Sequence, residues 1–272
     1  MRNHDSAAGK EIPLEPASPA DESKFFASYY RSTVRGAVTD SMTIGTVSEP
    51  ESRFHYNASE NSIIRALTAR ESVRQPPAVW RFAQQRRAWS VLDIGSGSGH
   101  WVDFYLDVYL ARSVTAVEFV PQMAEFLREK YRGRAEVRVL AADVAESLPV
   151  SETFDVVNAI GVMFHIVDDA RWRRALAHMA AVMKPTGVML VGGDFGEVTR
   201  DVQFHRVDEF ASWREHDTAQ APTSRVNKRV RSLSDWRAAA HEAGLTVVEV
   251  VRSDACELIR TPENDLLVMQ RA

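Results

Sequence analysis

Residues 91–99, Val-Leu-Asp-Ile-Gly-Ser-Gly-Ser-Gly, place a carboxylate before three glycines in a pattern that suits ligand binding. Asp93 closes an apolar run, and glycine then occupies every second position from 95 to 99. Glycine has no Cβ, so the chain can turn tightly and a ligand can approach the backbone closely. A helix that begins near His100 would offer free N–H groups to the negative end of that ligand. The pattern predicts a strand, a loop and a helix that hold a nucleoside-bearing cofactor, with Asp93 as a fixed acceptor.

Two further carboxylates stand where predicted strands end. Glu118 lies at the end of a strand over 114–119, and its side chain can accept two hydrogen bonds from a ribose diol. Asp143 follows a strand over 137–141 and can accept a hydrogen bond from an adenine amino group while Val144 packs on the ring. Alternatively, Glu118 is a solvated strand end and Asp143 is a turn or cap residue. Because ligands bind at the carboxyl ends of parallel strands, the two carboxylates together favour cofactor binding.

The spacing of the glycines separates two classes of nucleotide cofactor. A dinucleotide-binding loop follows the pattern G-x-G-x-x-G, in which the last glycine lets helix and strand pack closely. Gly95 and Gly97 fit that pattern, but His100 takes the place of its third glycine. The alternative spacing D-x-G-x-G-x-G is complete. A nicotinamide-dependent reductase is therefore disfavoured.

Composition narrows the class of protein. The chain has 272 residues, 45% of them hydrophobic, which suits one large globular domain or one domain with additions. Its formal net charge of −4 provides no general attraction to nucleic acid. No apolar run reaches the roughly 18 residues that a membrane span requires, so we expect neither nucleic acid nor a membrane as a partner. The single cysteine, Cys256, fits a reducing compartment, and we expect a cytoplasmic protein.

Hydrophobic periodicity predicts an α/β fold. Helical patterns cover 59–89 (interrupted by prolines at 76 and 77), 121–131, 169–183 and 234–243, and apolar strand patterns cover 114–119, 137–141, 154–160, 187–192, 245–251 and 265–269. Strands joined by helices in this way indicate a parallel sheet that is covered on both faces. No helix links the last two strands, so we expect them to form an antiparallel hairpin at the sheet edge. Asp168 or Asp169 is expected to cap the helix that follows it.

With these motifs in this order, the chain resembles the class I S-adenosylmethionine-dependent methyltransferases from about Trp89 to Ala272. Five motifs carry the resemblance: Asp93–Gly99, Glu118, Asp143, Phe154–Asn158 and Met183–Gly187. The resemblance implies a doubly wound, Rossmann-like sheet of seven mostly parallel strands with an antiparallel last strand, and S-adenosyl-L-methionine as the cofactor. It also implies cofactor contacts from Asp93, Gly95, Ser96, Gly97, Gly99, Glu118, Phe119, Asp143, Val144 and Asn158.

The predicted domains follow from the same patterns. Residues 1–23 mix charged residues, Ser, Ala and Pro without an apolar core, so we expect a disordered tail and no signal peptide. Residues 24–88 are expected to form an N-terminal helical extension or cap. Residues 89–272 are expected to form the methyltransferase domain, and a polar insertion at about 194–232 is expected to interrupt it.

Candidate residues for the methyl acceptor lie outside the glycine loop. His165 follows the strand over 154–160, and its ordinary pKa of about 6.5 suits a catalytic base; alternatively it packs against or caps the next helix. Arg53 and Tyr56 belong to an aromatic-rich segment that either contacts the ligands or docks the extension onto the sheet. His205 lies in the insertion and is either a substrate contact or a surface residue.

A basic cluster precedes the last predicted helix. It consists of Arg225, Lys228, Arg229 and Arg231. We expect this cluster to be a solvated charged face; the alternative is a site for a carboxylate or phosphate on the substrate.

Absent motifs narrow the acceptor. The segment Asn158-Ala159-Ile160-Gly161 lacks the Asn/Asp-Pro-Pro-Tyr/Phe sequence of enzymes that methylate planar amines, and we recognise no paired glutamates of the kind used in arginine methylation. Only Asp168 and Asp169 suggest convergent carboxylates, so we expect no metal. The chain is therefore expected to transfer a methyl group by in-line displacement to an oxygen or nitrogen of a small molecule. The alternatives are a catalytically inactive cofactor-binding partner protein and an aminopropyltransferase.

Overall fold

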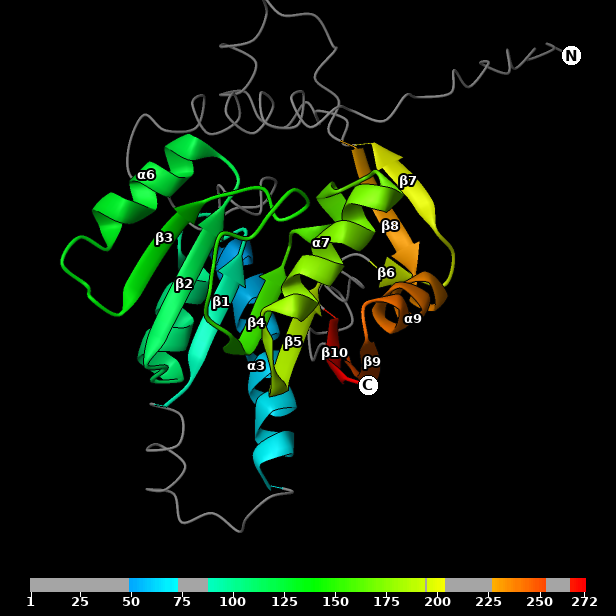
Figure 1. Ribbon diagram of the computed structural model, residues 1–272, viewed down its shortest axis with the longest axis horizontal. Coiled ribbons are helices and arrows are strands. Elements are labelled where there is room, and N and C mark those ends of the chain that lie inside the picture. The colour runs from blue at the N-terminus through cyan, green and yellow to red at the C-terminus, as the bar shows by residue number, and fades with distance from the viewer. Residues whose placement is uncertain (1–48, 73–87, 194, 204–226, 253–264) are drawn as a thin grey trace, which may run out of the picture.

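The computed structural model describes residues 49–72, 88–193, 195–203, 227–252 and 265–272. Its centre is a seven-stranded sheet with the strand order β3-β2-β1-β4-β5-β10-β9 (Figure 1). These strands are β1 (Ser90–Ile94), β2 (Ser113–Glu118), β3 (Val137–Ala141), β4 (Phe154–Ile160), β5 (Met183–Gly192), β9 (Leu245–Val251) and β10 (Leu266–Arg271). The first five pair in parallel, whereas β10 pairs antiparallel with both β5 and β9. The predicted sheet and its antiparallel end are confirmed.

Helices cover both faces of this sheet. They are α3 (Glu49–Ser72), α5 (His100–Asp103), the π-helical turn η1 (Phe104–Val108), α6 (Pro121–Lys130), the 3-10 turn η2 (Met163–His165), α7 (Asp169–Ala181) and α9 (Leu233–Glu242). In Figure 1, α7 lies in front of the sheet and α3 lies behind it. Two apolar clusters form the core, one beneath α7 and α9 and the other beneath α3, α5 and η1.

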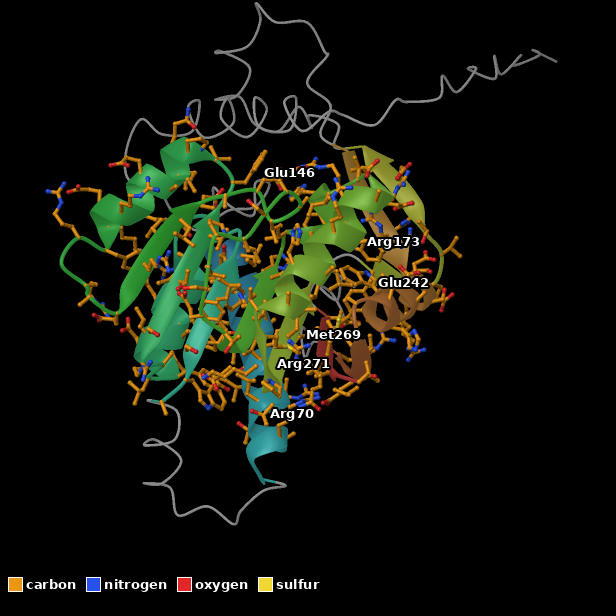
Figure 2. The ribbon with its side chains drawn as sticks, in the orientation of Figure 1. Arg70, Glu146, Arg173, Glu242, Met269 and Arg271 are labelled. Carbon is orange, nitrogen blue, oxygen red and sulfur yellow. The ribbon has the colours of Figure 1, made fainter. Side chains whose placement is uncertain are left out.

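The two helices on the front face also contact each other. The rings of Trp172 and Trp236 meet edge to face with centroids 4.8 Å apart. Arg173 and Glu242, both labelled in Figure 2, form an ion pair of 3.1 Å from α7 to α9. On the opposite face, Arg70 of α3 contacts Glu249 of β9 at 3.1 Å. The layers are therefore joined by apolar packing inside and by ion pairs at their rims.

Several element boundaries differ from those predicted. The helix predicted to begin at 59 begins at Glu49. The helix predicted to run to 183 ends at Ala181, because Met183 already begins β5 and pairs there with Phe154 of β4. Its start is as predicted, since the side chain of Asp168 accepts a hydrogen bond from Arg171 N and caps α7.

The described part of the insertion forms a second, three-stranded sheet. Its strands are β6 (Phe195–Gly196), β7 (Arg200–Gln203) and β8 (Asn227–Ser232), in the order β6-β8-β7. The expectation of a solvated basic face is wrong for Arg231, whose side chain is only 2% exposed. It is wrong because β8 lies against η2, which buries the side chain. The described part of the chain contains no helix long and apolar enough to cross a membrane and no group of side chains suited to a metal ion.

Candidate active site

The glycine loop connects β1 to α5 at the carboxyl end of the sheet. Gly95, Gly97 and Gly99 have φ angles of 70°, 51° and 87°, a left-handed region that favours glycine. The N–H of Gly95 donates to Val117 O at 2.8 Å, which ties the loop to β2. Gly99 is the N-cap of α5, so this helix begins at the predicted place. The loop is thus fixed to its neighbouring strand.

A side chain at Gly95 would also collide with the segment that follows β4. A Cβ built on Gly95 would lie 2.3 Å from Cγ2 of Val162. In the same way, a Cβ on Gly193, just after β5, would lie 2.8 Å from the ring of Phe164. Glycine at these positions lets the segment 161–165 approach the loops after β1 and β5.

Glu118 lies at the end of β2, where it orders the backbone of the glycine loop. Its side chain accepts hydrogen bonds from Gly97 N and from Val120 N, each at 2.9 Å. Burial raises the pKa of Glu118, and these N–H donors offset part of that rise. Phe119 is partly buried against Val120. Glu118 therefore links the ends of β1 and β2, and its contact with a ribose diol stays a prediction.

Asp93 lies at the centre of the sheet and is completely buried. Asn158, its register partner on β4, donates from Nδ2 to Asp93 Oδ1 at 2.7 Å, and the hydroxyl of Tyr105 donates to Asn158 Oδ1 at 3.1 Å. Asp93 Oδ2 has no hydrogen-bond partner among the described residues. Burial raises the pKa of Asp93 to about 7. A buried carboxylate with an unused oxygen is ready to accept a hydrogen bond from a ligand.

Asp143 follows β3 and is held by two donors. Arg171 Nη2 of α7 lies 2.5 Å from Asp143 Oδ2, and Ala145 N donates to Oδ1 at 2.8 Å. A carboxylate has about four lone-pair positions, so these two contacts leave it able to accept more hydrogen bonds. Val144 is buried and belongs to the apolar core beneath α7. The structure therefore places the strand-end carboxylates in a row from β1 to β3.

His165 ends η2 and is half-buried beside Phe164, with ring centroids 4.4 Å apart. The segment after it is held by Arg231 of the insertion. Arg231 donates from Nη2 to Ile166 O at 2.8 Å and to Val167 O at 3.2 Å. Burial lowers the pKa of Arg231 to about 10, in spite of hydrogen bonds to Asp169. The insertion thus fixes the backbone that carries His165.

The extension helix α3 contacts the start of α5. Tyr56 stacks on His100 with ring centroids 3.7 Å apart, and Glu60 Oε1 lies 2.8 Å from His100 Nε2. These contacts dock α3 beside the glycine loop. They agree with the interpretation in which Tyr56 docks the extension, and a contact between Tyr56 and a ligand stays a prediction. The side chain of Arg53 is exposed, and its role in ligand binding stays a prediction. His205 lies outside the described residues.

Sequence reasoning missed several side chains that shape the site. The main ones are Tyr105, Arg171 and the pair Glu60–His100, and Arg231 was placed on a solvated face rather than beside His165. His100 drew notice only as a departure from the dinucleotide pattern. One signal was present for Tyr105, because an aromatic residue six positions after the last glycine of the loop falls within the first turns of the predicted helix.

The arrangement fits a cofactor that combines a nucleoside with a cationic amino acid. Asp93 has a buried, unpartnered oxygen for a cationic donor, and Glu118 and Asp143 retain acceptor capacity at the next two strand ends. S-adenosyl-L-methionine offers an ammonium, a ribose diol and an adenine amino group as the matching donors. Three acceptors in a row thus match three kinds of donor in number and in chemistry.

Known structures share this fold. The 1,6-didemethyltoxoflavin-N1-methyltransferase of Burkholderia thailandensis superposes with a TM-score of 0.60 at 19% identity, covering 99% of this chain and 98% of that one. For an S-adenosylmethionine-dependent methyltransferase of Clostridium acetobutylicum the TM-score is 0.54 at 14% identity, with 92% and 98% covered. An amino pentose methyltransferase of Micromonospora echinaspora gives 0.51 at 14%, with 97% and 99% covered. At these identities the likeness is one of fold.

Comparison of the sequence with family models adds one match to this likeness of fold. No curated protein matches the chain. Residues 91–187, which run from β1 through the glycine loop into β5, match the family model described as a methyltransferase domain. That range contains the glycine loop and all three strand-end carboxylates. The match spans about a third of the chain, so residues 91–187 are similar to a methyltransferase domain, and the whole described chain shares its seven-stranded fold with the solved structures.

Proposed function

We propose that this protein transfers the methyl group of S-adenosyl-L-methionine to an oxygen or nitrogen atom of a small molecule. The observation that carries the proposal is the row of carboxylates at the ends of β1, β2 and β3, with an unpartnered oxygen on Asp93. When bound, the cofactor supplies an electrophilic methyl group on a sulfonium, which is most of the chemical driving force.

The proposed work of the chain is to bind and orient. Asp93 accepts from the ammonium, Glu118 from the ribose diol and Asp143 from the adenine amino group, while Gly95, Gly97, Gly99, Ser96, Phe119, Val144 and Asn158 form the rest of the cofactor site. A fixed cofactor and a fixed acceptor turn a bimolecular displacement into an effectively intramolecular one.

His165 is the proposed base. It lies in the segment that approaches both the glycine loop, through Val162, and the end of β5, through Phe164. A neutral imidazole can take the proton that an acceptor hydroxyl or amine loses as its oxygen or nitrogen attacks the methyl group. Tyr56 and Arg53 on α3, and His205 in the insertion, are the proposed contacts for the acceptor.

The proposal of a small-molecule acceptor is supported by the known structures that share this fold over nearly their whole length. According to their names, two of these proteins methylate small molecules: one acts on a toxoflavin precursor at nitrogen and the other on an amino pentose in calicheamicin biosynthesis. At the end of β4 the sequence Asn158-Ala159-Ile160-Gly161 lacks the motif of enzymes that methylate a planar nucleobase amine.

Titration calorimetry with S-adenosylmethionine and S-adenosylhomocysteine tests the cofactor assignment. We expect the wild type to bind both and Glu118→Gln to bind at least tenfold more weakly, because glutamine keeps one acceptor oxygen and turns an N–H₂ group toward a backbone N–H. Glu125→Gln is the matched control, since Glu125 is an exposed glutamate of α6 whose side chain is 75% accessible. It should bind like the wild type.

The outcomes separate clearly. A wild type that binds neither compound refutes the proposed function. Binding with release of S-adenosylhomocysteine only when a phenol, an amine or a sugar is added identifies the acceptor class. In that assay, an unchanged kcat for His165→Ala would remove His165 from the role of base.

A further inference from the structure

A chain of two hydrogen bonds ends on Asp93. The Tyr105 hydroxyl donates to Asn158 Oδ1 at 3.1 Å, and Asn158 Nδ2 donates to Asp93 Oδ1 at 2.7 Å. All three side chains are fully buried. Tyr105 reaches this position from η1, a π-helical turn that follows directly on α5. π-Helical turns occur mostly as single turns in α-helices, frequently at functional sites.

The hydroxyl of Tyr105 decides which end of the Asn158 side chain faces Asp93. In the observed orientation, the tyrosine O–H has its acceptor and the amide N–H₂ points to the carboxylate. If the amide rotated by half a turn, its oxygen would face Asp93, which would then need a proton to avoid repulsion. The tyrosine O–H would lose its acceptor, because the described residues offer it no other. An unsatisfied buried donor is costly, so the observed orientation is favoured.

The other charged or titratable groups near Asp93 lie on β2, on α5, on η1 and just after α6. Glu118 on β2 raises the pKa of Asp93, whereas His100 on α5 lowers it. Burial is the largest influence on the pKa of Asp93 and raises it; the hydrogen bond from Asn158 is the next and lowers it, and Ser96 in the glycine loop lowers it further. The pKa values of Tyr105 and of Tyr131, which follows α6, are raised mainly by burial, and the Asp93 charge adds to both rises. Asn158 is therefore the strongest of the groups that favour the charged carboxylate.

We propose that Tyr105 and Asn158 are positioning residues that favour the carboxylate form of Asp93 and aim its free oxygen at the ammonium of the cofactor's amino-acid part. The proposal rests on the proposed function, because it takes S-adenosylmethionine as the ligand. It predicts that Tyr105 governs the affinity for the amino-acid half of the cofactor and leaves the adenosine half unaffected. It also predicts that this influence fades at high pH, where Asp93 is ionised in any orientation of the amide.

Tyr105→Phe tests this with two ligands and a pH series. S-adenosylhomocysteine carries the ammonium, whereas 5′-methylthioadenosine has the same nucleoside and lacks the amino acid. Calorimetry from pH 6 to pH 8.5 should show Tyr105→Phe binding S-adenosylhomocysteine about five- to tenfold more weakly than the wild type below pH 7, the loss expected for one hydrogen bond. The ratio should approach one at pH 8.5. For methylthioadenosine, the ratio of variant to wild-type dissociation constants should stay near one at every pH. Because variant and wild type are compared at the same pH, any titration of the ligand itself cancels from this ratio.

Two variants complete the design. Asn158→Leu removes the donor to Asp93 and should give the same pattern with a larger loss, and it also serves if Tyr105→Phe does not fold. Tyr109→Phe removes another fully buried tyrosine hydroxyl on the same segment and should bind both ligands like the wild type. A loss for Tyr105→Phe that is equal for the two ligands, or independent of pH, overturns the proposal. A wild type that binds neither ligand overturns the proposed function instead.

Discussion

Two buried charges in two regions of the site are treated in opposite ways. Asp93, in the cofactor region around the glycine loop, has one donor from Asn158 and an oxygen with no partner. Arg231, in the insertion, donates from Nε and Nη2 to Asp169 and from Nη2 to the carbonyl groups of Ile166 and Val167, and its guanidinium lies 4.2 Å from the centre of the Trp172 ring; Nη1 alone of its nitrogens has no hydrogen-bond partner among the described residues. Burial favours the neutral form of both groups: it raises the pKa of Asp93 to about 7 and lowers the pKa of Arg231 to about 10.

The difference indicates two kinds of work. Burying a charge is unfavourable unless the protein pairs it, so a buried charge that lacks a partner reduces stability and marks a place for a ligand. A buried charge that is paired on several sides holds structure together. On this basis Asp93 is a ligand-binding group, and Arg231 is a clamp on the segment that carries His165. Each assignment makes a different prediction for stability.

Asp93→Asn should stabilise the protein without cofactor, by up to about 4 kcal/mol above pH 7, because the pKa of Asp93 rises from 3.8 to about 7 on folding. Between those values the folded state keeps a proton that the unfolded state has lost, so the stability of the wild type falls as pH rises through this window. Asparagine does not ionise. The gain should therefore be absent below pH 4, grow up to pH 7 and then level off.

Urea unfolding at pH 4, 6 and 8 measures this gain, with Asp155→Asn as the matched control. Asp155 accepts hydrogen bonds from Ser90 N and from Lys184 Nζ, so its replacement should destabilise the protein. Asp93→Asn should at the same time lose most of its affinity for S-adenosylhomocysteine. A variant that is less stable than the wild type at pH 8 would show that Asp93 is a structural group.

Arg231→Ala should have the opposite effect and lower the free energy of unfolding by about 3 kcal/mol, because two backbone carbonyl groups and the face of Trp172 lose their partner. The partner carboxylate of Asp169 is half-exposed and can be hydrated, which limits the loss. Arg231→Lys keeps the charge but not the planar fork and should recover part of the stability. Urea unfolding gives the values, and calorimetry should show S-adenosylhomocysteine affinity within about twofold of the wild type. A large loss of affinity at unchanged stability would contradict the clamp.

The two regions also differ in how far the sequence reveals them. The glycine loop, Glu118 and Asp143 were predictable because a strand, a turn and the next strand end follow from local spacing, and parallel strands bring those ends together. The burial of Arg231 was not, since its acceptor Ile166 lies 65 residues earlier and meets it only when β8 packs on η2. The same holds for Arg171, which pairs with Asp143 across 28 residues. Local sequence patterns predict where a turn lies and where a strand ends. They do not predict contacts between distant residues, which here depend on how the insertion and α7 pack.

The cofactor region and the segment held by Arg231 meet where Gly95 faces Val162, and a methyl group placed there tests how firmly the two are joined. Gly95→Ala should destabilise the protein by about 2 kcal/mol, because its φ of 70° strains alanine and its Cβ would lie 2.3 Å from Val162 Cγ2. Combining it with Val162→Ala removes the collision but leaves the backbone strain, so about half of the loss should return.

Gly133→Ala is the control that measures the backbone strain alone, because Gly133 also has a positive φ but nothing lies within 4 Å of an added Cβ. If Gly95→Ala and Gly133→Ala cost the same in urea unfolding, Val162 yields easily and the two regions are only loosely coupled. If Gly95→Ala costs more and Val162→Ala recovers the difference, the clamp of Arg231 reaches the glycine loop through this contact.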